Sequence, residues 1–165
     1  MPPKTDAVTI RDARPADATA LGVLGAELVR VHHGFDPLRF LEPRAGTAEG
    51  YGNFLRSQLG DPATVVLVAE HDGVLVGYAY AGFEDVDYMS LRGPAGVLHD
   101  VVVTPAKRGT GIGRRLVEAV LARLAAGGAP RVVLSTAERN AAAQALFAAL
   151  GFRRTMVEMT RELGA

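Results

Sequence analysis

The chain has 165 residues, and its 18 basic and 18 acidic side chains cancel. This balance argues against nucleic acid or an anionic membrane as a partner and favours a small-molecule or peptide substrate. The chain has no cysteine, which excludes disulfides, thiolate zinc sites and a cysteine nucleophile. The length suits a single catalytic domain with a real core, and we expect a loose terminus over residues 1–7 and one domain over residues 8–165.

The N-terminus carries no recognisable targeting signal. Its first residues, MPPKTD, have no apolar stretch of signal-peptide length, and no segment approaches 18 uninterrupted apolar residues. These features predict a soluble, cytoplasmic enzyme.

Strand and helix patterns alternate along the chain. Asp72-Gly73 between two apolar runs predicts a hairpin, and Gly127-Gly128 marks the end of a helix with one broad apolar face. Strands are expected at residues 8–12, 64–70, 74–83, 96–103, 131–136 and 152–161. Helices are expected from Pro15, over 47–59, from about 112 to 126 and over 140–150. This order predicts an α/β fold in which helices cover one sheet.

Residues 101–114, VVVTPAKRGTGIGR, join an apolar strand to a helix through a glycine-rich turn. Glycines at 109, 111 and 113 permit a tight bend, and the first amides of the helix point outward at its positive dipole end. Such a turn suits a phosphorylated ligand, although glycines also serve ordinary strand-to-helix connections. The dinucleotide pattern G-x-G-x-x-G fails, because its third glycine falls on Arg114 or Leu116, and a Walker loop lacks its Gly-Lys-Ser/Thr.

Two motifs resemble the GCN5-related N-acetyltransferase (GNAT) family. Arg108-x-x-Gly111-x-Gly113 is similar to its acetyl-CoA-binding motif, Arg/Gln-x-x-Gly-x-Gly/Ala. Residues 140–152, NAAAQALFAALGF, are similar to its C-terminal signature, N-x-x-A-x-x-L-Y-x-x-x-G-F. The resemblance runs from Ile10 onward and implies the acyl-CoA N-acyltransferase fold, a single mixed, mostly antiparallel sheet with helices on both faces.

The resemblance also implies acetyl-CoA as co-substrate. The turn amides from about Arg108 to Arg114 would hold its pyrophosphate, the preceding strand would pair with its pantetheine arm, and Asn140 would bond that arm. Asn140 equally fits a helix N-cap. The implied cofactor-binding residues are Val101, Val102, Val103, Arg108, Gly109, Thr110, Gly111, Ile112, Gly113, Arg114, Asn140 and Phe147.

Phe147 departs from the family pattern, in which a tyrosine near the thioester sulfur can protonate the leaving thiolate. A thiol has a pKa of about 8.5, so the thiolate is a tolerable leaving group near neutral pH. Water, Tyr80 or Tyr88 could supply the proton. The departure leaves a second hypothesis open, a non-catalytic sensor or scaffold domain that binds acyl-CoA.

The implied reaction is direct transfer of the acetyl group to the amine of a small molecule or peptide. An alkylammonium, with a pKa of about 10.4, must first lose a proton, and backbone amides of an irregular strand would bind the oxyanion. The catalytic candidates are His99 and Asp100, expected on opposite faces of their strand because side chains alternate. Histidine titrates near neutrality, which makes His99 the first candidate for the base. Alternatively, His99 is a hydrogen-bonded sheet residue and Asp100 bonds backbone in the helix layer.

Acceptor recognition falls, by resemblance, to the first two helices, their connection and the loop before the central strand. Carboxylates there would bind a cationic amine, although charged loops are also typical of solvated surface. Adjacent His32 and His33 predict no metal, since neighbouring helical residues point about 100° apart. A homodimer is a further expectation from the family. The implied substrate-binding residues are His32, His33, Phe35, Asp36, Tyr80, Glu84 and Tyr88.

Overall fold

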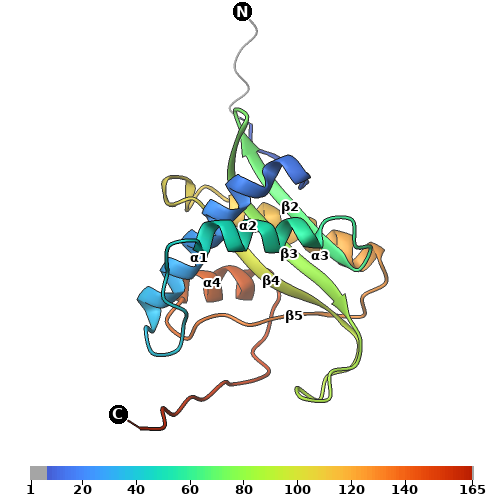
Figure 1. Cartoon of the computed structure of the whole chain (residues 1–165). Coiled ribbons are helices and arrows are strands. Elements are labelled where there is room, and N and C mark those ends of the chain that lie inside the picture. Colours follow the sequence, from blue (N-terminus) through green and yellow to red (C-terminus); the bar gives the residue numbers. More distant parts are fainter. Residues whose placement is uncertain (1–6, 165) are drawn as a thin grey trace, which may run out of the picture.

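The computed structural model describes residues 7–164 and shows a five-stranded sheet between helices (Figure 1). The strands stand side by side in chain order; the first four are antiparallel, and the last runs parallel to its neighbour. This mixed, mostly antiparallel sheet confirms the predicted fold class. The strands are β1 (Thr9–Asp12), β2 (Thr64–His71), β3 (Val74–Glu84), β4 (Ala95–Val103) and β5 (Val132–Leu134).

Helices cover both faces of the sheet. A 3-10 turn (Pro15–Asp17) leads into α1 (Ala18–Phe35), which packs with α2 (Thr47–Gln58) on one face. A second 3-10 turn (Pro105–Lys107) precedes α3 (Ile112–Ala126), which shares the other face with α4 (Ala141–Ala149). The apolar face predicted for α3 is buried in the larger core, through Ile112, Leu116, Val117, Val120 and Leu124. No helix of residues 7–164 has the length and apolarity needed to cross a bilayer.

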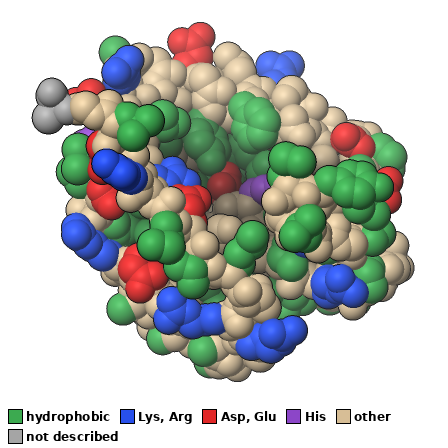
Figure 2. All heavy atoms as spheres, turned by 90° about the horizontal axis from the view of Figure 1, so that it is seen from below, with side chains coloured by type: hydrophobic (Ala, Val, Ile, Leu, Met, Phe, Trp, Pro, Cys, Tyr) green, Lys and Arg blue, Asp and Glu red, His purple; other side chains and the backbone are tan. Residues whose placement is uncertain are grey.

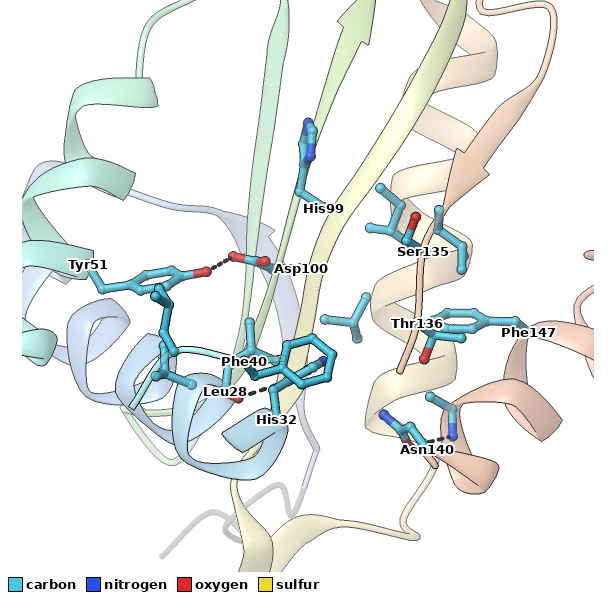
Figure 3. Close-up of a pocket in the computed structure, with 16 residues that line it drawn as sticks. Leu28, His32, Phe40, Tyr51, His99, Asp100, Ser135, Thr136, Asn140 and Phe147 are labelled. Atoms are coloured by element: carbon cyan, nitrogen blue, oxygen red, sulfur yellow. Dashed lines mark hydrogen bonds between the residues drawn. The ribbon is translucent and has the colours of Figure 1, made fainter. Parts of the chain in front are cut away.

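Small residues let α1 and α2 approach closely. A Cβ atom on Gly22 would lie 2.1 Å from the Ala48 carbonyl oxygen, so no larger residue fits that crossing. One turn later, a Cβ on Gly25 would lie 2.2 Å from the ring of Tyr51. Gly25 therefore provides the space in which the Tyr51 ring lies, and this ring reaches from α2 toward β4 (Figure 3).

Strand β4 is irregular in its middle. Its pairing with β3 shifts between Tyr80↔Asp100 and Ala81↔Leu98, which leaves His99 as the extra residue of a β-bulge. On the other side, β5 pairs only with residues 96–98. Among the described residues, β4 therefore has a strand on one side only beyond Leu98, and its opposite edge is open from His99 to Val103.

The prediction of a strand at residues 152–161 is wrong, because residues 152–164 form no helix or strand. The strand predicted at 131–136 is shortened to β5. Gly151 ends α4 in the left-handed conformation, with φ +88°, and the Phe152 amide donates to the Phe147 carbonyl. The chain then leaves the body of the domain (Figure 1). A strand-like sequence needs a neighbouring strand edge to pair with, and here this segment meets none.

Candidate active site

A cavity of about 290 Å³ lies where β4 and β5 separate. Seen from below, the molecule is hollowed, with acidic and histidine side chains at the floor of the hollow and hydrophobic side chains around it (Figure 2). Helices α1 and α2 contribute one wall and α4 the other (Figure 3). The lining residues are Leu28, Val29, His32, Phe40, Leu41, Tyr51, Leu98, His99, Asp100, Val101, Leu134, Ser135, Thr136, Asn140, Ala143 and Phe147.

Asp100 is the one acidic residue among those that line the cavity. Two tyrosines donate to the same oxygen, Oδ2: the hydroxyl of Tyr51 at 2.6 Å and that of Tyr78 at 2.9 Å. Burial, reinforced by the negative charge of Asp100, raises the pKa of both tyrosines, so they stay protonated and donate. Because both bonds fall on Oδ2, the other carboxylate oxygen, Oδ1, keeps its lone pairs for a ligand.

The expectation that His99 and Asp100 lie on opposite faces of β4 is wrong. The His99 ring stacks on Tyr80, with centroids 4.9 Å apart, while Asp100 accepts from Tyr78. Tyr78 and Tyr80 are two residues apart on one strand and so share a face. The bulge is the cause, because its extra residue shifts the alternation and turns two consecutive side chains to the α1–α2 side. Asp100 also bonds side-chain hydroxyls rather than backbone.

His99 links the cavity to residues behind it. Its Nε2 atom lies 3.3 Å from Oε1 of Glu84, and the other carboxylate oxygen of Glu84 accepts from Arg92 at 2.8 Å. Tyr80, beneath the imidazole, donates its hydroxyl to Gln58 at 3.1 Å. Neither Glu84 nor Tyr80 lines the cavity; each reaches it through His99.

The glycine turn presents a run of unpaired backbone amides. Gly109 and Gly111 have φ of +75° and +85°, the left-handed region that suits glycine. Within residues 7–164, the backbone amides of residues 109–114 donate to no acceptor. Arg108 differs, since its amide donates to the Pro105 carbonyl at 3.3 Å. The stretch of unpaired backbone amides therefore begins at Gly109, one residue later than expected from the sequence.

The turn is tied to the elements that form the cavity. The Arg108 guanidinium donates to the Val103 carbonyl at 3.1 Å and to Glu27 of α1 at 2.9 Å. A Cβ on Gly113 would lie 3.6 Å from Leu146 of α4 and 3.8 Å from Val103. The amides thus lie beside the end of β4 and beside α4, the same two elements that flank the cavity.

Helix α4 carries the second motif. The side-chain oxygen of Asn140 accepts from the Ala143 amide at 3.1 Å, which confirms the N-cap, and the residue also lines the cavity. Phe147 lines the cavity as well, with its ring packed edge-on against Phe152 at 5.7 Å. The position at which the family pattern places a proton-donating tyrosine is therefore occupied by the apolar ring of Phe147, which has no proton to donate. Tyr88, the other proposed substitute, is 77% exposed in the β3–β4 connection and does not line the cavity.

Of the four acceptor-binding residues predicted on α1 and at its C-terminal end, His32 alone lines the cavity. Its Nδ1 lies 2.9 Å from the Leu28 carbonyl oxygen. The other three have local roles: His33 lies 3.3 Å from the Phe40 carbonyl, Phe35 packs edge-on against His32, and Asp36 accepts from the Leu38 amide.

Several residues that line the cavity were not predicted from the sequence. Tyr51 lies in the short helix predicted over residues 47–59, and its partner Asp100 is 49 residues away. Ser135 and Thr136 lie in a predicted strand, yet they follow the end of β5 and place hydroxyls at the cavity. Their position depends on where β4 and β5 separate, which a local pattern does not encode.

The family model described as the acetyltransferase (GNAT) family matches residues 31–152. A mycothiol acetyltransferase of Thermobispora bispora is 42% identical over 103 residues, which are 60% of this chain and 33% of that protein. An uncharacterized N-acetyltransferase, YhfO of Bacillus subtilis, is 28% identical over 147 residues, 88% of this chain and 89% of that protein. The match thus spans about a third of the mycothiol enzyme but most of YhfO.

A solved structure shares the fold across the whole chain. The aminoglycoside N-acetyltransferase AAC(6')-Iy, crystallised in complex with CoA, superposes with a TM-score of 0.75 at 21% identity and covers 100% of both chains.

Proposed function

The chain belongs to the acetyltransferase (GNAT) family, and on this premise we propose that it transfers an acetyl group from acetyl-CoA directly to an amine. One observation carries the proposal: a cavity with a carboxylate at its floor opens between β4 and α4, beside a turn of unpaired backbone amides. The amides suit an anionic ligand and the carboxylate suits a cationic one, so the site has a place for each substrate.

The donor side is formed by the turn and by β4. Amides of residues 109–114 bind the pyrophosphate oxygens, because they lack protein acceptors and lie at the positive end of α3. The open edge of β4 from His99 to Val103 offers backbone groups to the amides of the pantetheine arm. Asn140 keeps its side-chain NH2 group for the same arm while its oxygen caps α4.

The acceptor is an amine whose positive charge lies next to an apolar group. Its ammonium donates to Oδ1 of Asp100, and its apolar part packs against Leu28, Phe40 and Leu41. His99, held by Glu84 and Tyr80, takes one ammonium proton, and the freed lone pair attacks the thioester carbonyl. A backbone amide at the bulge donates to the oxyanion. Collapse of the intermediate expels CoA thiolate, and water carries the second proton from the nitrogen to the sulfur, because Phe147 has no proton to donate.

The relatives support a small-molecule acceptor. One relative is named a mycothiol acetyltransferase, and a solved structure of the same fold is named an aminoglycoside N-acetyltransferase. A cytoplasmic location remains a prediction from the lack of cysteine and of a targeting segment. The absence of nucleic acid and membrane as partners remains a prediction from the neutral charge. We also propose that the chain forms a homodimer, as expected from the family. The sensor or scaffold hypothesis predicts binding of acetyl-CoA without release of thiol.

Calorimetric titration with acetyl-CoA, compared with CoA and ATP, tests the donor site without knowledge of the acceptor. We expect selective binding of acetyl-CoA and CoA over ATP, followed by thiol release when amines are added. Selective binding with no thiol release from any amine in a broad panel would favour the sensor hypothesis. A folded protein that binds none of the three would contradict the proposed function.

Substitution Asp100→Asn tests the acceptor site. The amide still accepts from Tyr51 but loses the charge, so KM for a cationic amine should rise roughly 10- to 100-fold, the value of one hydrogen bond to a charged group. The turnover number kcat should change far less. Asp85→Asn is the matched control, because it removes one carboxylate from the β3–β4 connection without touching the cavity. A KM that rises for Asp85→Asn and not for Asp100→Asn would place the amine at the loop instead.

A further inference from the structure

We propose that the acceptor is an amine with no carboxylate on the carbon that bears its nitrogen, so that the cavity binds simple amines and rejects the corresponding free amino acids. This inference rests on the proposed function and narrows the class of acceptor within it. It is carried by the surroundings of Asp100: a negative charge that no cation balances, histidines already held by protein oxygens, and an apolar wall.

The negative charge of Asp100 has only neutral hydrogen-bond donors. These are the hydroxyls of Tyr51 and Tyr78, which stay protonated because burial raises the pKa of both. Among residues 7–164, no basic side chain forms an ion pair with Asp100, and no lysine or arginine lines the cavity. A carboxylate held by neutral groups keeps its full charge, so it attracts an ammonium and repels a second carboxylate.

The two histidines of the cavity already have protein partners. Nδ1 of His32 lies 2.9 Å from the Leu28 carbonyl oxygen, which can only accept, so Nδ1 carries the hydrogen and Nε2 of the neutral ring is an acceptor. Nε2 of His99 lies 3.3 Å from Glu84, so a proton on this ring is balanced by a protein carboxylate. Neither ring therefore supplies an unbalanced positive charge beside Asp100.

The walls of the cavity differ in what they offer to an anion. On the side of Asp100, the apolar lining residues of α1 and the α1–α2 connection are Leu28, Val29, Phe40 and Leu41. These side chains give a carboxylate no hydrogen bond, and burying it against them is costly. The neutral donors Ser135, Thr136 and Asn140 lie across the cavity from Asp100 (Figure 3). An anionic group near Asp100 therefore loses water without gaining a donor.

The position of a carboxylate on the substrate decides how strongly Asp100 repels it. In an α-amino acid, three bonds separate the nitrogen from each carboxylate oxygen, so these oxygens lie within about 4 Å of the ammonium. With the ammonium on Oδ1, the two carboxylates stand about 5–6 Å apart, and at an effective dielectric constant of about 20 their repulsion lowers affinity about 10²-fold. A carboxylate about 10 Å away is largely screened. The selection is therefore local, and it works by repulsion.

A set of matched acceptors separates charge from size. Pentylamine has an ammonium and an apolar chain, norleucine adds a carboxylate on the carbon that bears the nitrogen, and norleucinamide makes that group neutral. The isomer of norleucine with its carboxylate at the far end of the chain is ε-aminocaproate. At saturating acetyl-CoA, KM measured by thiol release should be about 10²-fold higher for norleucine than for pentylamine. Norleucinamide and ε-aminocaproate should stay close to pentylamine. Phenethylamine and phenylalanine repeat the comparison with an aromatic chain.

Equal KM values for norleucine and pentylamine would overturn the proposal. A KM for norleucinamide as high as that for norleucine would also overturn it, because size and not charge would then decide. Failure of the proposed function looks different, since the protein would bind CoA and release no thiol from any acceptor. In that case calorimetric titration of the CoA complex with pentylamine and norleucine measures the selection directly, and equal or absent affinity for both refutes it.

Substitution Asp100→Asn tests whether this carboxylate is the cause. KM for pentylamine should rise, while norleucine is no longer repelled, so the ratio of the two KM values should fall toward one. Asp85→Asn removes a carboxylate outside the cavity and should leave the ratio as it is. Acetyl-CoA titration checks that both variants are folded. A ratio that stays at about 10² in Asp100→Asn would contradict the role given to Asp100.

Discussion

Replacing Gly111 by valine should abolish acetyl-CoA binding while the domain stays folded. The residue has φ +85° immediately before α3, a conformation that costs an L-residue about 1–2 kcal/mol and a β-branched one more. A valine there would force the turn into another shape and turn the amides of residues 109–114 away from a common point. Each lost hydrogen bond to a charged phosphate is worth about 1.5–3 kcal/mol, so affinity should fall beyond calorimetric detection.

The other end of the same helix offers a matched control. Gly128 has φ +87° and, like Gly111, open space where a Cβ would be placed. Gly128→Val therefore carries comparable backbone strain far from the turn. Both variants should lose thermal stability to a similar degree, as circular dichroism would measure, but only Gly111→Val should lose acetyl-CoA. Retained affinity in Gly111→Val, or equal losses in the two variants, would refute the role given to the turn.

Local sequence patterns predicted most of the fold. The Asp72-Gly73 pair adopts positive φ at both residues between β2 and β3, because two-residue hairpin turns require it. The spacing of apolar residues on α3 predicted which face of the helix is buried. The glycine turn was also predicted correctly, because its backbone geometry depends on a few consecutive residues. Each of these features depends on neighbours within one or two turns of the chain.

The chemistry of the cavity depends on contacts that no local pattern contains. The bulge at His99 is a property of how β3 and β4 pair, and it reversed the expected direction of one side chain. The hydroxyls on Asp100 come from Tyr51 and Tyr78, 49 and 22 residues away in sequence. Gly25, which leaves room for the Tyr51 ring, looks in the sequence like an ordinary helix residue. Long-range packing therefore decided which polar groups face the substrate.

The C-terminal segment shows a third case, in which the local pattern and the structure of one chain disagree. Residues 152–161 have the sequence of a strand, yet strand formation depends on a neighbouring edge that a single chain does not bring to it.

Substitution His99→Ala should lower kcat by about 10²- to 10⁴-fold, the usual contribution of a positioned general base. The direction in which kcat/KM changes with pH follows from the role of His99 as a base. An imidazole accepts a proton only when it is neutral, so kcat/KM of the unmodified enzyme should rise with pH. Without the imidazole that rise should disappear, while acetyl-CoA affinity, measured by calorimetry, should stay within a few-fold.

Two further variants separate proton transfer from packing. Glu84→Gln keeps the size of the group 3.3 Å from Nε2 but removes its charge, so it should displace the rise in the pH profile rather than abolish it. His71→Ala is the control, because it removes a histidine at the β2–β3 turn, outside the cavity. If His99→Ala leaves the profile unchanged, the imidazole is not the base. Proton removal would then pass to water ordered by Asp100, the remaining titratable group on the same face of β4, and the Asp100→Asn variant would lose kcat instead of raising KM.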